Sequence, residues 1–304
     1  MYLAFQIDSL FCFLWHLFSL HTHLMLSFLA FKAHFEYSKH MELVEYPELT
    51  RVRHGKPIFP DNFFCCLKTL EFVAASKIQI VIPSYVLPYM KNIEELKVNS
   101  CGAAQVIFDI VDTETRHKSI VFLLKRLTLE SLSNLECVWN KNPKGIASFP
   151  NLQEVVVNSC DSLKSLFPSS LPRNLGKLKT LRISWCNKLE EIVGKEDAME
   201  HGVSETFEFP SLLSLNLLHL PRLSCFYPGK HHLECPRLET LYVHVCSKLK
   251  LFTSEFHCHK ETVIHSDQNI VPIMRLQQPL FSVEKVTKHG TRNLFFLLFS
   301  LFSS

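Results

Sequence analysis

The chain has 304 residues, of which 47% are hydrophobic and 20% are charged, and its formal net charge is +3. This composition excludes a mainly disordered chain, because such chains combine low hydrophobicity with a high net charge. The weak positive charge, without a sustained run of Lys or Arg, gives no support for nucleic-acid binding, which depends on many basic contacts to phosphates.

The N-terminal segment, residues 1–62, differs in composition from the rest of the chain. Residues 9–31 contain no Lys, Arg, Asp or Glu. As a helix, at about 1.5 Å per residue, this stretch would measure roughly 35 Å, enough to span a bilayer. No basic residue precedes it, as a secretory signal would require. Two interpretations stay open: a membrane anchor that leaves the following residues in the cytoplasm, or a non-native segment from a misplaced gene boundary.

Residues 63–255 carry one short pattern of apolar residues about seven times. The pattern is apolar-x-x-apolar-x-apolar-x-x-(Cys or Leu)-x-x-Leu-x-x-apolar, and its copies are 26 to 34 residues apart. They begin at Leu67, Ile93, Leu124, Leu152, Leu178, Leu212 and Leu238. A recurrence of this length with this Leu spacing is the signature of leucine-rich repeats. In such a solenoid each repeat buries its apolar face only against its neighbours.

Each copy opens with an apolar-x-apolar step, which predicts a short strand. Stacked strands of this kind would form a parallel sheet on the inner, concave side of an arc, while the later Leu and aromatic residues line the convex side. The sequence therefore predicts an α/β leucine-rich-repeat solenoid with irregular or short helical segments on the convex side. Two longer copies contain extra residues, 109–118 and 194–208, which we expect to be surface loops.

One position of the repeat is filled by Cys in four copies and by Leu in two. A position that accepts either residue indicates a small buried side chain rather than a disulfide. This favours a reducing compartment, as does the absence of any Asn-x-Ser/Thr sequon. The expected location is the cytoplasm, or a membrane anchored through residues 9–31 with the repeats facing the cytoplasm. The six positions are Cys101, Leu132, Cys160, Cys186, Leu220 and Cys246.

The sequence around the strands is more specific than the Leu spacing alone. Two copies open with Phe149-Pro150-Asn151-Leu152 and Phe209-Pro210-Ser211-Leu212, and one strand is followed by Trp185-Cys186-Asn187-Lys188-Leu189. These segments resemble the C-terminal leucine-rich repeats of plant intracellular disease-resistance proteins of the coiled-coil, nucleotide-binding class. The resemblance covers about residues 60–255, and the tail, residues 256–304, holds an incomplete repeat at 279–286.

The resemblance implies a non-enzymatic protein-recognition module in plant defence. Its partner would be a pathogen effector, a host target or a nucleotide-binding receptor. The chain has no Gly-x-x-x-x-Gly-Lys-Ser/Thr phosphate loop, so the nucleotide-dependent switch of such receptors does not carry over. We expect no cofactor and a truncated protein of the disease-resistance type.

No motif predicts catalysis or metal binding. The sequence His257-Cys258-His259 would direct alternate side chains to opposite faces of an extended segment, whereas zinc requires four converging ligands. No catalytic signature is present. The sequence therefore predicts that the chain is not an enzyme and holds no metal.

The outward positions of the strands predict a protein-binding site. In the fifth to seventh repeats these positions include aromatic and basic residues, whereas the first four repeats carry mostly small or charged ones. Trp, Tyr and Arg are enriched at binding hot spots. The alternative is that a further repeat or the C-terminal tail covers these side chains. The predicted binding residues are Arg182, Trp185, His219, Tyr242 and His244.

Two other functions stay open from the sequence. One is a membrane-tethered leucine-rich-repeat binding protein, which would use residues 9–31 as its anchor. The other is a substrate-recruiting adaptor for ubiquitin ligation, which would need a ligase-binding helical motif before the repeats. Residues 32–62 show no strong motif of that kind.

Overall fold

The computed structural model describes residues 39–44, 65–111, 119–195, 205–229, 231–249, 256–257, 263–266 and 269–270. The apolar segment 9–31, the incomplete repeat at 279–286 and most residues of the two predicted loops lie outside these ranges. Within the described ranges, no helix is long and apolar enough to cross a membrane.

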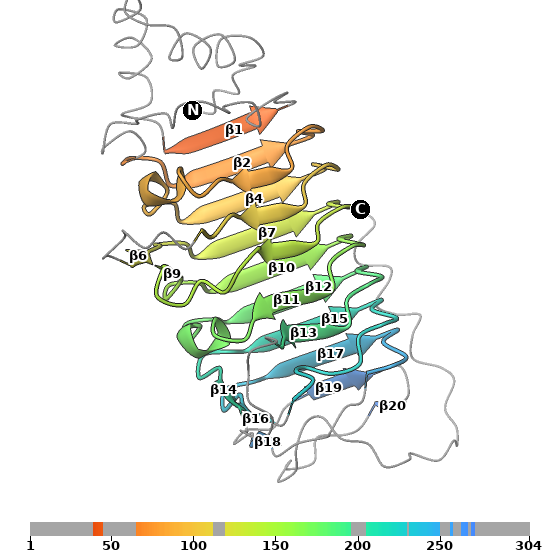
Figure 1. Ribbon diagram of the computed structural model, residues 1–304. Coiled ribbons are helices and arrows are strands. Elements are labelled where there is room, and N and C mark those ends of the chain that lie inside the picture. The colour runs from red at the N-terminus through yellow and green to blue at the C-terminus, as the bar shows by residue number, and fades with distance from the viewer. Residues whose placement is uncertain are drawn as a thin grey trace, which may run out of the picture.

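A ten-stranded sheet runs along the whole length of the described chain (Figure 1). Every neighbouring pair is parallel except the last, which is antiparallel. In spatial order the strands are β1 (His40–Val44), β2 (Thr69–Val73), β4 (Glu95–Asn99), β7 (Arg126–Glu130), β10 (Glu154–Asn158), β12 (Thr180–Ser184), β15 (Ser214–Leu218), β17 (Thr240–His244), β19 (Val263–Ser266) and β20 (Asn269–Ile270).

The strands of the seven predicted repeats, β2 to β17 in this sheet, stack in one constant register. Val155 on β10, for example, pairs with Leu127 on β7 and with Leu181 on β12. All three side chains are buried. Along each strand the buried residues alternate with residues whose side chains are directed away from the core. The predicted parallel-strand solenoid of leucine-rich-repeat type is therefore confirmed.

The sheet extends past both ends of the predicted repeat block at 63–255. Strand β1 pairs residue for residue with β2, and β19 pairs with β17, so that His265 stands beside Tyr242. The strand of the seventh repeat is thus not an edge of the sheet. The boundaries of the repeat domain itself stay a prediction.

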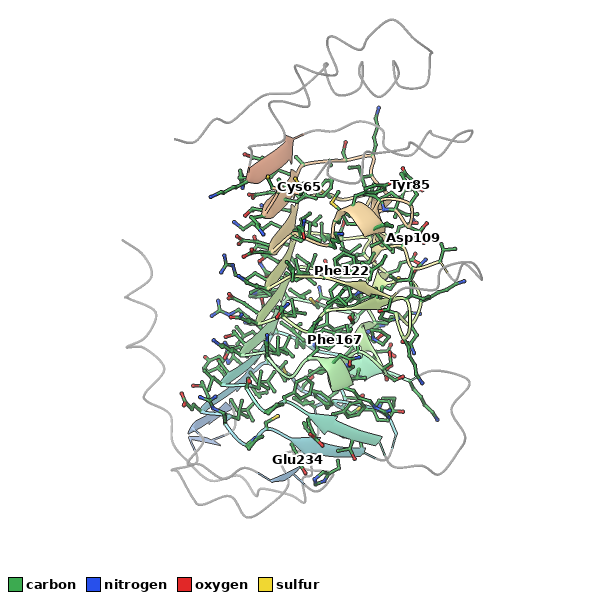
Figure 2. All side chains as sticks on the ribbon, turned by 90° about the vertical axis from the view of Figure 1, so that its left-hand side faces the viewer. Cys65, Tyr85, Asp109, Phe122, Phe167 and Glu234 are labelled. Atoms are coloured by element: carbon green, nitrogen blue, oxygen red, sulfur yellow. The ribbon has the colours of Figure 1, made fainter. Side chains whose placement is uncertain are left out.

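The opposite, convex side consists mainly of short parallel strands, which were not expected from the sequence (Figure 2). The only helices among the described residues are two single turns of 3₁₀ helix, η1 (Leu87–Tyr89) and η2 (Pro172–Asn174). The convex-side sheets are β3 (Ile80–Ile82), β5 (Val106–Phe108) and β8 (Cys137–Trp139); β6 (Ile120–Val121) and β9 (Ala147–Ser148); β11 (Ser165–Pro168) and β13 (Glu191–Gly194); and β14 (Glu205–Glu208), β16 (His231–Glu234) and β18 (Phe256–His257).

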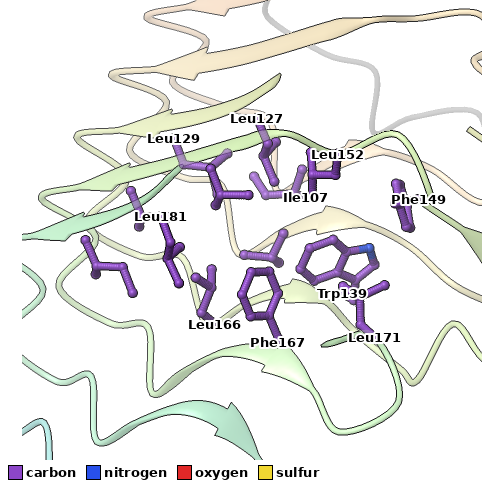
Figure 3. Packing of buried hydrophobic residues seen from close by; sticks show 14 of the residues in the cluster. Ile107, Leu127, Leu129, Trp139, Phe149, Leu152, Leu166, Phe167, Leu171 and Leu181 are labelled. Atoms are coloured by element: carbon purple, nitrogen blue, oxygen red, sulfur yellow. The ribbon is translucent and has the colours of Figure 1, made fainter. Parts of the chain in front are cut away.

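The core lies between these two layers and is continuous along the stack (Figure 3). On the concave side it is filled by Leu, Val and Ile from the strands. On the convex side a group of rings fills the wider space, and Phe149 is fully buried between Phe122, at 4.9 Å between ring centroids, and Phe108, at 5.3 Å. Trp139 stacks on Phe108 at 5.7 Å. These rings tie together successive repeats on the convex side, where Phe108 and Trp139 are also register partners on β5 and β8.

The Cys position of the repeat contains free thiols. Cys101, Cys160 and Cys186 are buried, and each Sγ donates to the backbone carbonyl two residues earlier, at 3.3–3.6 Å. The predicted role as small buried side chains holds for these three. Cys246 in the seventh repeat is only partly buried, although its Sγ donates to the carbonyls of His244 and Leu217 at 3.5 Å.

Candidate protein-binding face

The residue that follows each repeat strand has a left-handed backbone conformation. Its φ lies between 51° and 56° in all seven repeats. In the first six repeats the backbone N–H of this residue donates to a carbonyl at the end of the next strand, for example from Trp185 to Leu218 at 3.0 Å and from His219 to His244 at 2.8 Å. In these six repeats the contact with the next repeat supports this conformation, whichever side chain is present. The seven residues are Ala74, Ser100, Ser131, Ser159, Trp185, His219 and Val245.

The side chains at this position change sharply along the stack. The first four are Ala or Ser, whereas the last three are Trp, His and Val. A left-handed conformation costs an L-residue roughly 1–2 kcal/mol, and it is least suited to bulky or β-branched side chains. Burial does not offset this cost, because Trp185 is 52% exposed and Val245 is 42% exposed. Core packing therefore does not explain the choice of these residues.

Four of the five predicted binding residues form a continuous run of aromatic contacts. The ring of Trp185 stacks on that of His219, with 3.7 Å between centroids and 7° between planes. His219 meets His244 edge to face at 5.1 Å, and His244 lies beside Tyr242 at 6.3 Å. We call these four residues the aromatic run. It crosses three neighbouring repeats on the face of the sheet that points away from the core.

Arg182, the fifth predicted residue, lies on the same face in the column of Tyr242. It is exposed on β12, in register with Val156 on one side and Asn216 on the other. Among the described residues, no carboxylate forms an ion pair with Arg182.

The basic residues on or directly beside β4 and β7 are paired. Lys125 Nζ lies 2.6 Å from Glu94 Oε2, and Arg126 Nη2 lies 3.2 Å from Glu95 Oε2. Lys97 Nζ lies 3.5 Å from Glu95 Oε1. The positive charge on this part of the concave side is therefore compensated locally, unlike that of Arg182.

The structure thus places all five predicted residues on one face and brings four of them into contact, while Arg182 lies in the column of Tyr242, two strands away. Val245, which is not among the predicted binding residues, occupies the same turn position as Trp185 and His219. The available signal was a Trp, a His and a Val at a position where three earlier repeats have Ser.

Of the His257-Cys258-His259 segment, Cys258 and His259 lie outside the described ranges. Two other His residues of the convex side, His231 and His232, have polar contacts of their own. His231 Nδ1 lies 2.9 Å from the carbonyl of Gly229, and His232 Nε2 lies 2.9 Å from Glu234 Oε1. The described ranges contain no group of three or more His, Cys, Asp or Glu arranged to hold a metal ion.

Comparison with known proteins places the chain among plant disease resistance proteins. The family described as "Plant disease resistance protein RPS2-like, leucine-rich repeats" matches residues 37–187 and 174–257. The Arabidopsis thaliana protein At4g19050, which is named as a disease resistance protein, is 30% identical over 161 residues, 53% of this chain. At4g14610, named in the same way, is 29% identical over 197 residues, 60% of this chain. The matched region spans only 12% and 25% of these two curated relatives. Since the family match covers well over half of the sequence, the chain belongs to the RPS2-like leucine-rich repeats of plant disease resistance proteins.

Proposed function

We propose that this chain is a non-enzymatic recognition module of plant defence that binds a protein partner through the concave side of its fifth to seventh repeats. Membership of the disease-resistance family supports the biological role. The solenoid supports the mode of action, because stacked repeats create an extended concave surface suited to partner binding. The partner would be a pathogen effector, a host target or a nucleotide-binding receptor.

The observation that carries the proposed site is the state of Trp185. Its backbone is left-handed, its side chain is 52% exposed, and its ring is held against His219. The left-handed turn recurs in all seven repeats, but here it carries an exposed Trp, the type of side chain that dominates binding energy. Tyr242, His244 and Arg182 extend the same face.

The test is a double variant, Trp185→Ser with Tyr242→Ala, made in the full chain. Ser is chosen because it occupies the equivalent turn in the second to fourth repeats, so the fold accepts it. The control is Glu71→Ala with Lys97→Ala, which changes the same column on β2 and β4. Proximity labelling in leaf cells should give partners with the wild type and the control that are absent with the double variant.

Two outcomes would contradict the proposed site. Equal labelling by the double variant and the wild type would show that the partner docks elsewhere. Loss of the far-ultraviolet circular dichroism signal in the double variant would show that Trp185 and Tyr242 are needed for folding.

We further propose that the chain acts in the cytoplasm as part of a larger receptor or as a truncated form of one. The free thiols at the Cys position agree with a reducing compartment. Fractionation of leaf cells tests this, because recovery in the membrane fraction after a salt wash would favour the anchored alternative through residues 9–31.

A further inference from the structure

The concave side changes its charge between the fourth and fifth repeats. Each of the first four repeat strands carries one outward Glu, whereas the outward positions of β12, β15 and β17 contain no Asp or Glu. The residues that follow these last three strands are also free of carboxylates. The four outward Glu residues are Glu71, Glu95, Glu130 and Glu154.

The same three strands and turns carry Arg182, two His and a series of hydroxyl and amide groups. We define this surface, the outward side of β12, β15 and β17 with Trp185, His219 and Val245, as the C-terminal concave face. Arg182 is its fixed positive charge, and the described part of the chain supplies no carboxylate to neutralise it. Exposed Arg presents a planar fork of donors that matches a carboxylate in a bidentate way.

From this charge pattern we propose that the C-terminal concave face binds an extended acidic segment of a partner protein, in which Asp or Glu side chains alternate with apolar ones. This inference rests on the proposed function. Arg182 receives a carboxylate of the segment. The Trp185–His219 stack and the exposed Val245 receive its apolar side chains.

Charge complementarity favours an acidic segment over a basic segment at the C-terminal concave face. A segment rich in Lys or Arg would meet Arg182, which forms no ion pair with a carboxylate in the described part of the chain, and like charges across an interface suppress binding. Glu71, Glu130 and Glu154, which form no ion pair among the described residues, add to the selection, because they repel an acidic segment that slides toward the first repeats. The boundary between β10 and β12 therefore sets the position of the segment along the stack.

The experiment uses the full chain and three labelled eight-residue peptides that alternate Leu with Asp, Asn or Lys. Fluorescence anisotropy measures the dissociation constant of each peptide. We expect the Asp peptide to bind about tenfold or more tightly than the Asn peptide, as a charge-assisted hydrogen bond would give. The preference should weaken as salt is raised, because exposed charges are screened.

The decisive variant is Arg182→Glu, which should reverse the preference from the Asp peptide to the Lys peptide. Lys97→Glu is its matched control, because it makes the same change of net charge in the same column, on β4. This control should retain the preference for the Asp peptide within about twofold.

The remaining outcomes show whether the acidic-segment inference fails alone or together with the proposed binding site. If the Asp and Asn peptides bind equally and Trp185→Ser weakens both, the face is a binding site but not for acidic segments. If Lys97→Glu removes binding while Arg182→Glu and Trp185→Ser do not, both the inference and the proposed location are wrong. If none of the peptides binds, the inference fails, and partner labelling by the wild type still decides the proposed function.

Discussion

The indole of Trp185 lies flat on the imidazole of His219, with their planes 7° apart and their centroids separated by 3.7 Å. The two residues come from successive repeats but occupy the same left-handed turn. Each ring therefore restricts the rotation of the other. A side chain that is already ordered before binding loses less conformational entropy when a partner docks.

We predict that Trp185→Ser changes the free energy of unfolding by less than about 1.5 kcal/mol. The variant loses an exposed aromatic stack, which contributes roughly 0.5–1.5 kcal/mol, and part of this loss is offset because a small side chain suits the turn better. Phe149→Ala is the comparison, since this ring is fully buried and its loss should cost about 3–5 kcal/mol. Urea denaturation measures both. A cost for Trp185→Ser as large as that for Phe149→Ala would identify Trp185 as a core residue.

Val245→Gly should stabilise the chain by about 1 kcal/mol. Val245 is β-branched, has a φ of 53° and is 42% exposed, and glycine adopts this conformation without the steric cost. Val243→Gly, two residues earlier on β17, is the control and should destabilise, because Val243 is buried in a strand. Thermal melting of the two variants gives the answer, and a lower melting temperature for Val245→Gly would mean that its side chain has a packing role.

The buried thiols should resist alkylation in the native protein. Burial raises the pKa of Cys101, and contact with the Cys186 thiol together with burial raises the pKa of Cys160, so little reactive thiolate is present at these two positions. Contact with Cys160 lowers the pKa of Cys186, so the protection of Cys186 comes from its burial. The exposed Cys65 should react first and Cys246, which is partly buried, at an intermediate rate. Mass spectrometry after timed labelling with iodoacetamide resolves each site. Rapid native labelling of Cys160 or Cys186 would show that the stack opens at the fourth and fifth repeats.

His231 lies among the rings of Phe207, Phe226 and Tyr227, with centroid distances of 5.7–6.2 Å. Burial lowers the pKa of His231, and the hydrogen bond to the Gly229 carbonyl opposes this shift. Because folding lowers the pKa of this imidazole, the unfolded chain takes up a proton at His231 more readily than the folded chain does. The free energy of unfolding therefore decreases as the pH falls below the ordinary pKa of about 6.5.

The wild type should therefore lose stability between pH 7.5 and pH 5.5, and His231→Phe should lose less over the same range. The melting temperature of each protein is measured at both pH values. Comparing the two decreases removes the contribution of the other His residues, which both proteins share. An identical decrease in both proteins would show that His231 is not responsible.

The sheet and its register were predictable from the sequence, whereas the turn geometry was not. The spacing of Leu152, Val155 and Val157 fixes which residues point inward, and this places Arg182 and Tyr242 in one column, as the pairing through Asn216 shows. A left-handed Trp or Val runs against local preference. For Trp185 it is supported by a backbone hydrogen bond to Leu218 in the next repeat, which no single repeat reveals.

The convex side was less predictable for a different reason. Segments such as Ile80–Ile82 and Cys137–Trp139 are too short to show a period, and they form strands because the neighbouring repeat offers a partner at the same height. The ring group around Phe149 likewise depends on residues from several repeats, and insertions of different length separate them along the sequence. The shared repeat position of Trp185 and His219 implied that the two side chains would be neighbours, but it did not imply that their rings would stack.

The conserved backbone shape of the turn column has a consequence for how such receptors diversify. Seven successive turns accept Ala, Ser, Trp, His and Val with φ values within a few degrees of one another. A lineage can therefore explore new specificities through single codon changes at these positions, without insertions or a shift in strand alignment. Each step alters the side chain displayed on the concave side while leaving the backbone geometry of the turn unchanged.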